Sequence, residues 1–245
     1  MIAPRHLDKA PITEALVDIR VKLGSETNLS TLQSVCALIA NEYPEKQERI
    51  HLESKIEFKT MKSETTSGVD GYLCTSSDKK QVVQVRLDGF TFSRLTPYET
   101  WEDLRKEAHR LWQLYVGATS PEFVTRLALR YINRLEIPLP IMDCSDYLTA
   151  PPTIPEKLPQ ELISFLTQNV IRDPSLGFFA IINQWRESSE ASSNVVPVIL
   201  DIEVFKEVQQ NTDATAIWET IDQLRDFKNK IFFGSITEKL MELCK

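Results

Sequence analysis

The stretch FVTRLALRYINRLEI, residues 123–137, decides the fold because polar and apolar side chains alternate along it. One set of alternate positions carries Arg126, Arg130 and Arg134. The other set carries Leu127, Leu129, Tyr131, Leu135 and Ile137. A period of two residues is typical of a strand with one buried face and one solvated face. The sequence therefore predicts a strand that presents three arginines on the face away from the core.

Residues 14–23 repeat this alternation and predict a second half-buried strand. Its polar face carries Glu14, Asp18 and Arg20, whereas small and β-branched apolar residues occupy the other face. If the two strands lie centrally in one sheet, Asp18 and Arg20 share an open face with the three arginines. This face is the first candidate site.

Between these strands the apolar spacing changes from two residues to three and four, which predicts helices. After residues 14–23, the first half is predicted to contain a helix at 28–42, strands at 47–61, 69–77, 80–88 and 89–95, and a helix at 98–116. After the strand at 122–137, the second half is predicted to contain a proline-rich crossing loop at 138–159, a short helix at 158–169, strands at 176–187 and 195–206, a helix at 214–230 and a further helix from about Ser235. Polar segments at 62–70 and 187–194 are expected to be flexible hairpin loops.

The order of these elements predicts an α+β fold, in which an antiparallel sheet has long helices packed on one face. Residues 1–118 and 119–245 follow a similar order, so they are expected to form two β-α-β-meander-α, helix-grip-like halves that share one sheet. Residue identity between the halves is too low to prove duplication. We expect residues 1–245 to form a single domain.

Composition is that of a soluble globular protein, with 42% hydrophobic and 26% charged residues. The 28 Lys and Arg residues against 35 Asp and Glu residues give a formal net charge of -7. This acidity disfavours general affinity for nucleic acid or for an anionic membrane. No signal-peptide pattern and no membrane-spanning apolar run occurs, and the four cysteines are widely spaced. A cytoplasmic protein with reduced thiols is expected.

Catalytic signatures are missing from the sequence. His6, His51 and His109 have no metal-ligand spacing to another histidine, cysteine or carboxylate, and no phosphate-cradling or nucleophile motif occurs. The carboxylate pair Asp201 and Glu203 shares a strand face, but such pairs in an acidic chain usually lie on solvated surface. The sequence therefore predicts no catalytic residue, no metal and no cofactor.

The arginine row has two interpretations. Alternating charge is usual on the solvated face of an antiparallel sheet, where Glu14, Asp18, Glu53 and Glu57 could be the partners of the arginines. The arginines could instead bind a phosphate or a carboxylate through their planar, two-point donors. Trp185, just before a polar hairpin tip, is a candidate partner anchor or an edge-packing residue.

Four segments carry a resemblance to a known family: APITEALVDIRV at 10–21, FTFSRLTPYETWEDL at 90–104, VTRLALRYINRLEIP at 124–138 and IDQLRDFKNKIFFGSIT at 221–237. They resemble a sporadically distributed prokaryotic family of uncharacterised proteins. The matching positions are Phe92, Arg94, Tyr98, Trp101, Arg126, Arg130, Tyr131, Asn133 and Arg134. The patchy distribution of that family implies an accessory role, such as a component of a defence or toxin-antitoxin module, and supplies no active site.

Three functions follow as hypotheses. The first is a non-enzymatic binding or accessory protein that holds a protein partner or a small anionic ligand on the open sheet face. The second is an enzyme acting on a phosphate- or carboxylate-bearing small molecule, with the arginines as clamp and Asp18 or Glu14 as acid-base group. Nucleic-acid binding is third and would require strong charge segregation. Open sheet edges would also allow a homodimer.

Overall fold

The computed structural model describes residues 7, 9–57, 62–139, 143–188, 194–212 and 214–245. The fold is α+β, with a large open sheet whose neighbouring strands are all antiparallel. The strands are β1 (Ile12–Lys22), β2 (Glu45–Glu57), β3 (Lys62–Thr75), β4 (Gln81–Arg86), β5 (Gly89–Leu95), β6 (Phe123–Pro138), β7 (Leu166–Asp173), β8 (Phe178–Arg186) and β9 (Val195–Gln210). The helices are α1 (Leu29–Leu38), α2 (Trp101–Thr119), the short 3-10 turn η1 (Cys144–Asp146), α3 (Ala214–Ser235) and α4 (Glu238–Leu243).

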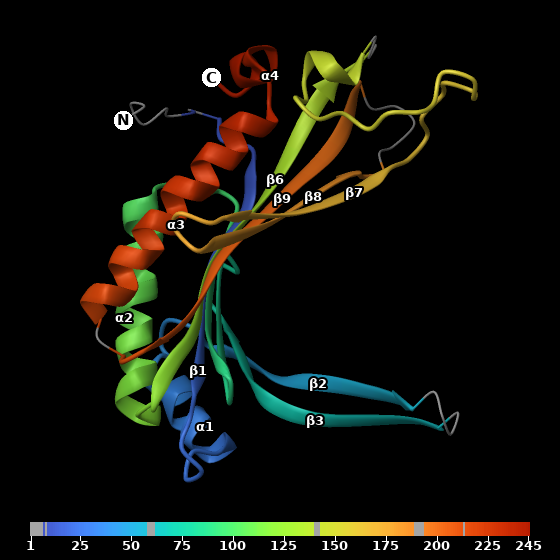
Figure 1. Ribbon diagram of the computed structural model, residues 1–245. Helices are drawn as coiled ribbons and strands as arrows, with labels where there is room; N and C mark the ends of the chain where they lie inside the picture. The colour runs from blue at the N-terminus through green and yellow to red at the C-terminus, as the bar shows by residue number, and fades with distance from the viewer. Residues whose placement is uncertain (1–6, 8, 58–61, 140–142, 189–193, 213) are drawn as a thin grey trace.

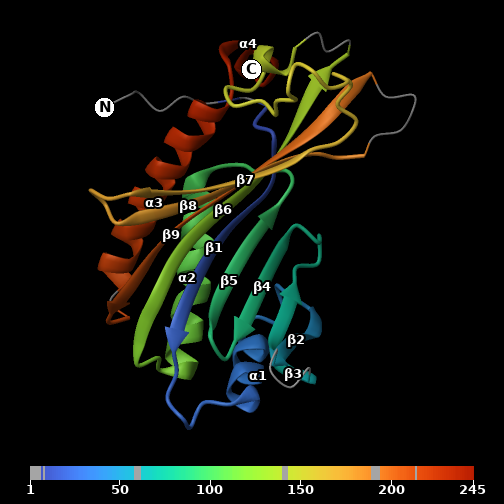
Figure 2. The same cartoon turned by 45° about the vertical axis from the view of Figure 1, so that its right-hand side comes forward.

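The sheet order is β2-β3-β4-β5-β1-β6-β9-β8-β7. The two strands that alternate most clearly in the sequence, β1 and β6, are therefore central neighbours, as predicted. Their register places Arg20 opposite Arg126 and Leu16 opposite Arg130. In Figure 2 the central strands lie side by side in this order, with helices behind them.

All three of the longer helices lie on one side of the twisted sheet, and the β2–β3 hairpin extends away from the body (Figure 1). Helix α2 contacts β5 and β1, and α3 contacts β6 and β9. The buried side chains of β6, including Leu127, Leu129 and Tyr131, lie on the side that the helices cover. The predicted division of β6 into an apolar face and an arginine face is confirmed.

Helix α2 spans Trp101–Thr119, so it begins and ends three residues later than the predicted bounds of 98–116. Thr100 caps the helix, because its hydroxyl oxygen accepts a hydrogen bond of 3.1 Å from the backbone N–H of Asp103. Trp112 is fully buried and stacks on Tyr115, with 5.6 Å between the ring centroids. The aromatic contacts continue from these two rings to Phe90 on β5. Burial of these large rings against the sheet stabilises this half of the core.

The predicted helix at 158–169 is wrong. Residues 158–165 have no helical structure, and the residues that follow form β7, which pairs with β8. Leu158, Ile163 and Leu166 are exposed, so this segment has no buried stripe that would stabilise a helix. Pairing of β7 with β8 supplies its backbone hydrogen bonds instead.

The predicted hairpin loop at 62–70 is also wrong. These residues are part of β3, which pairs with β2 along its length, and the connection between the two strands lies at 58–61, outside the described residues. A two-stranded hairpin that leaves the body has no face to bury, so its polar composition does not exclude a strand. The other predicted loop, at 187–194, falls largely on residues 189–193, which the structure does not describe.

Candidate functional site

The three arginines of β6 all point to carboxylates on the open face. Arg130 donates two hydrogen bonds of 2.8 Å to Asp201. Arg126 donates one of 2.7 Å to Glu203, and Arg134 donates one of 2.8 Å to Glu187. Arg134 also bonds Glu136. Asp201 and Glu203 come from β9, the strand that pairs with β6, whereas Glu187 follows β8 and Glu136 lies on β6 itself.

Asp18 and Arg20 belong to a partly buried charge cluster on the same face. Arg86, only 4% exposed, donates a hydrogen bond of 2.7 Å to Asp18, and Thr91 donates another of 2.7 Å. Arg20 bonds Asp18 and Asp88. Burial alone would raise the pKa of Asp18, but the charge and hydrogen bond of Arg86 outweigh it and hold that pKa below its ordinary value. Asp18 is therefore ionised at neutral pH and unsuited to acid-base catalysis.

The ion pairs of the open face reduce the positive charge that is available to a ligand there. Hydrogen bonds from Arg130 to Asp201, and from Arg134 to Glu187, raise the pKa of each guanidinium. Both arginines remain charged but already have bonded carboxylates. The charge of each guanidinium is therefore already balanced by a carboxylate, and Asp201, only 2% exposed, is held in place beside Arg130. The open face is therefore a poor anion site.

Of the remaining predicted residues, Glu14 acts on these arginines, since its charge is one of those that raise the pKa of Arg130. Trp185 lies on β8 opposite Leu166 of β7 and Ile199 of β9, and it is half-buried. Glu53 and Glu57 lie on β2, at the far edge of the sheet from β6. Glu14 is half-buried on β1. Within the described part of the chain, no three His, Cys, Asp or Glu side chains gather in a way that could hold a metal ion.

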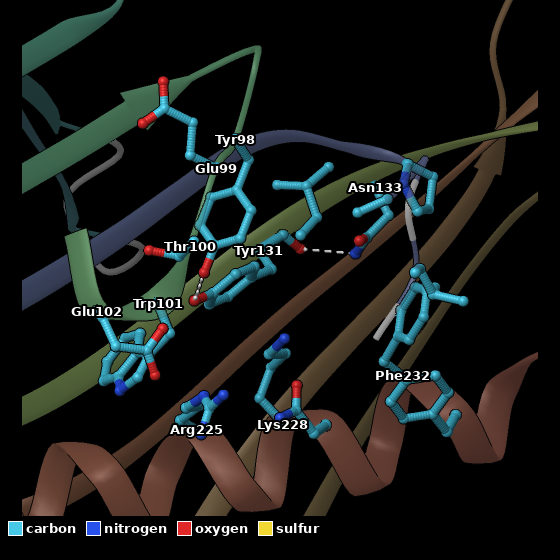
Figure 3. Close-up of a pocket in the computed structure, with 16 residues that line it drawn as sticks. Tyr98, Glu99, Thr100, Trp101, Glu102, Tyr131, Asn133, Arg225, Lys228 and Phe232 are labelled. Atoms are coloured by element: carbon cyan, nitrogen blue, oxygen red, sulfur yellow. Dashed lines mark hydrogen bonds between the residues drawn. The ribbon is translucent and has the colours of Figure 1, made fainter. Parts of the chain in front are cut away.

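A cavity of about 280 Å³ lies on the helical side, where α3 faces the start of α2 and the strands β1 and β6. The close-up in Figure 3 shows side chains from all these elements converging on it. The lining residues are Leu7, Ala10, Pro11, Ile12, Tyr98, Glu99, Thr100, Trp101, Glu102, Tyr131, Asn133, Arg225, Lys228, Asn229, Phe232 and Phe233. Its size lies at the lower limit of small-molecule sites, which favours a small ligand.

Lys228 is the most unusual group in this cavity. It is only 7% exposed, and its Nζ lies 3.7 Å from the centroid of the Tyr131 ring. Among the described residues, no carboxylate forms an ion pair with it. Burial, with a smaller contribution from the charge of Arg225, lowers the pKa of Lys228 to about 7. At neutral pH the amine is therefore present in both its charged and its neutral form.

Arg225 lies one turn before Lys228 on α3 and also lines the cavity. Its guanidinium lies 5.7 Å from the centroid of the Trp101 ring. Trp101 begins α2, so the amino end of that helix is close to the same cavity. Two cations and a helix amino end give the inner part of the site a positive potential. Glu99 and Glu102 at the rim are exposed.

The opposite wall consists of hydroxyl and amide groups. Tyr98 and Tyr131 share a hydrogen bond of 3.3 Å between their hydroxyl oxygens, and their rings meet edge to face. Burial raises the pKa of both phenols, so both are protonated at neutral pH. Asn133 donates a hydrogen bond of 2.9 Å to the carbonyl oxygen of Leu200, which fixes its amide. A second bond, to the carbonyl oxygen of Tyr131, occupies the same amide nitrogen, so the free donor of this wall is the phenolic O–H that the tyrosine pair does not use.

Sequence reasoning missed this cavity, although a signal was present. The apolar stripe of α3 runs through Ile217, Ile221 and Leu224, and its next position is Lys228. A lysine at a core position is rarely buried without a partner. Such a residue indicates a functional group or a buried ion pair. Lys228 was missed because only the apolar residues of the helix were considered.

Comparison with models of known protein families gives no match for this chain. A search of curated proteins also gives no match. None of the described helices is long and apolar enough to cross a membrane.

Proposed function

We propose that the protein binds a small anionic molecule in the cavity between α2 and α3, with Lys228 and Arg225 as its cationic contacts. The observation that carries this proposal is the burial of the Lys228 amine without a carboxylate partner among the described residues. A buried charge of this kind is unfavourable until an opposite charge joins it. A carboxylate or phosphate group would supply that charge.

The cavity is a better anion site than the open sheet face. On the open face each arginine of β6 already has a carboxylate within hydrogen-bonding distance. In the cavity, the two cations face aromatic rings and phenolic hydroxyls. A ligand entering the cavity gains ion pairs without breaking existing ones, so its net binding energy is larger.

We infer further that the sheet consists of two helix-grip-like halves and that the ligand is held where they meet. In the first half β1 is followed along the sheet by β5, β4, β3 and β2, and in the second half β6 is followed by β9, β8 and β7. The cavity combines Trp101 of the first half with Tyr131 and Lys228 of the second. Sites between structural units are common places for ligands.

The four segments that carry the family resemblance meet at this cavity. Residues 10–12, 98–102, 131 with 133, and 225–233 supply every lining residue except Leu7. If the resemblance reflects a shared function, this cavity is where the four resembling segments would perform it. A role as an accessory component of a prokaryotic defence or toxin-antitoxin module stays a prediction from the resemblance. A protein partner on the open face stays a prediction from the pattern of charged residues there.

Isothermal titration calorimetry with sulfate, phosphate and pyruvate tests the proposal. We expect wild-type protein to bind at least one of these anions at pH 6.5, where much of Lys228 is protonated. Arg225→Gln and Lys228→Met should each weaken binding by about tenfold or more, because each removes one charge-assisted contact. Lys230→Gln, an exposed lysine on the same helix, is the matched control and should bind as wild type does.

Arg130→Ala distinguishes the cavity from the open face. If the cavity is the site, this variant loses thermal stability, because Asp201 loses its bonded guanidinium, and keeps wild-type affinity. The proposal would be overturned if Arg130→Ala lost affinity while Lys228→Met kept it. The ligand would then bind at the arginines of β6.

A further inference from the structure

Lys228 has two neighbours that affect the nucleophilicity of its amine. Tyr131 covers it with a ring, which removes water, and Arg225 adds a like charge one helical turn away. Desolvation and an adjacent cation are the two conditions that make a lysine amine nucleophilic near neutral pH. Helix α3 therefore presents a reactive amine and a fixed guanidinium to the same cavity.

We propose that Lys228 forms a reversible imine with a 2-oxo acid whose carboxylate is held by Arg225. This proposal rests on the proposed function, because it names the ligand class and the chemistry of the same cavity. An anion site alone does not require a neutral amine. Imine formation does, because only the neutral amine can attack a carbonyl carbon.

The chemical step needs no oxidant, reductant or metal. The nitrogen lone pair of the neutral Lys228 amine attacks the carbonyl carbon of the 2-oxo acid, so a C–N bond forms and the π bond of the carbonyl group breaks. One amine proton moves to the oxygen, which becomes a hydroxyl group. That hydroxyl then leaves as water with the second amine proton, and the C=N bond of the imine results. Addition of water reverses the step and releases the 2-oxo acid unchanged.

The spacing of the two cations fits this ligand class. Side chains three residues apart on a helix have Cβ atoms about 5–6 Å apart, so their heads can reach adjacent atoms of one small molecule. In a 2-oxo acid the carboxylate is bonded directly to the reacting carbonyl carbon. Figure 3 shows Arg225 and Lys228 extending from α3 toward the Tyr98 and Tyr131 pair.

The phenolic hydroxyls can hydrogen-bond the carbonyl oxygen of the 2-oxo acid, which is the oxygen lost as water. Tyr98 and Tyr131 are protonated at neutral pH because burial raises the pKa of each hydroxyl. Tyr98 is half-buried at the cavity, so its hydroxyl can donate a hydrogen bond to a bound carbonyl oxygen. This bond would polarise the carbonyl group for attack by the amine.

Reductive trapping tests the inference. Wild-type protein is incubated with pyruvate and sodium cyanoborohydride at pH 7, and intact mass spectrometry and peptide mapping locate the reduced adduct. We expect one adduct at Lys228. Arg225→Gln should slow its formation about tenfold, because the carboxylate clamp is lost. Lys228→Arg should form none.

Internal and independent controls separate the outcomes. Lys230, exposed two residues away, reports non-specific modification, and equal labelling of Lys230 and Lys228 would overturn the inference. Circular dichroism and a thermal melt establish that Lys228→Arg is folded, and Lys228→Met serves as a second variant. Calorimetric binding of pyruvate without a trapped adduct overturns the imine and leaves the proposed function standing. If pyruvate neither binds nor forms an adduct, and sulfate and phosphate do not bind either, both the imine and the proposed anion-binding function are overturned.

Discussion

Two buried cations in this protein have opposite surroundings. Arg86 is 4% exposed and bonds Asp18, Asp88 and Thr91. Lys228 is 7% exposed and faces the ring of Tyr131, with no ion-paired carboxylate among the described residues. The first arrangement stabilises the folded chain, whereas the second costs stability. Groups that cost stability are expected where a ligand binds.

The Asp18 cluster predicts a stability loss in Asp18→Asn. The variant leaves the buried Arg86 guanidinium with only the exposed Asp88 carboxylate as a charged partner, which should cost about 3 kcal/mol of unfolding free energy. Urea unfolding at pH 7 measures it. Asp88→Asn is the control, because this more exposed carboxylate should cost less than 1 kcal/mol. Equal small losses in both variants would contradict the central role of Asp18.

The same residue predicts a pH dependence in acid. The folded pKa of Asp18 is lower than its unfolded value of about 3.9, so its contribution is complete above that value and is lost as pH falls through the folded pKa. Wild-type protein should therefore lose more stability than Asp18→Asn between pH 5 and pH 2. Parallel stability curves for the two proteins would show that Asp18 does not titrate as described.

Lys228 predicts a second rise of stability with pH, this time in alkali. Its folded pKa of about 7 lies below the unfolded value of about 10.4, so the unfolded chain binds more protons between these values and stability rises with pH there. Lys228→Met should be about 2 kcal/mol more stable than wild type at pH 7, and this advantage should shrink toward pH 10. Thermal melts across that range measure it. A less stable Lys228→Met at pH 7, with Lys230→Met unchanged, would mean that the lysine is satisfied in the fold.

At the scale of single residues, sequence could place the β6 arginines on a face but could not give their partners. Alternation along one strand is local information, and it correctly separated Arg126, Arg130 and Arg134 from the core. Their partners on β9 depend on which strand pairs with β6, and that pairing joins residues far apart in the chain. Lys228 stands out in the sequence on the apolar stripe of α3, but the cavity itself was not predictable, since Tyr131 and Lys228 meet only after α3 packs on the sheet.

At the scale of elements, the strand β3 contains two glycines with different roles. A Cβ on Gly71 would lie 2.2 Å from the carbonyl oxygen of Val85 on β4, whereas a Cβ on Gly68 meets nothing within 4 Å. The close approach at Gly71 belongs to the paired strands β3 and β4. The glycine at 68 lies in the hairpin that extends from the body.

This difference predicts different costs for two alanine substitutions. Gly71→Ala should destabilise the protein by about 2 kcal/mol or more, because backbone atoms must move to admit the methyl group. Gly68→Ala should change stability by less than about 0.5 kcal/mol. Chemical denaturation of both variants measures the difference. Equal costs would contradict the described register of β3 on β4.

Elements with strong periodicity were predictable, and weakly patterned ones were not. The strand β6 and the helix α2 have buried stripes that sequence alone reveals. The segment at 158–169 has a helix-like composition but no buried face, so its structure depends on pairing with β8. The polar residues at 62–70 extend β3 because the hairpin needs no core. Tertiary pairing, which local sequence does not encode, decides both cases.

At the scale of the whole molecule, the two halves depend on each other through the central strands. β1 and β6 pair along most of their length, and β6 also pairs with β9. Separating residues 1–118 from 119–245 would leave a long central strand edge unpaired in each half. The single domain therefore stays a prediction, which this shared strand pairing makes testable.

Separate expression of the halves tests this dependence. We expect neither half to give a cooperative thermal melt alone, because each loses the partner of its innermost strand, and co-expression should restore a soluble complex with a strand-rich circular dichroism spectrum. A monomeric half that melts cooperatively on its own would show two independent domains.

We propose Lys228 as a partly neutral amine in a cavity that accepts anions. An NMR titration of the Lys228 side chain, assigned by comparison with Lys228→Arg, tests this without and with saturating sulfate. We expect a pKa near 7 without sulfate and a higher pKa with it, because a bound anion favours the protonated amine. An ordinary lysine pKa of about 10.4 that sulfate does not change would contradict it.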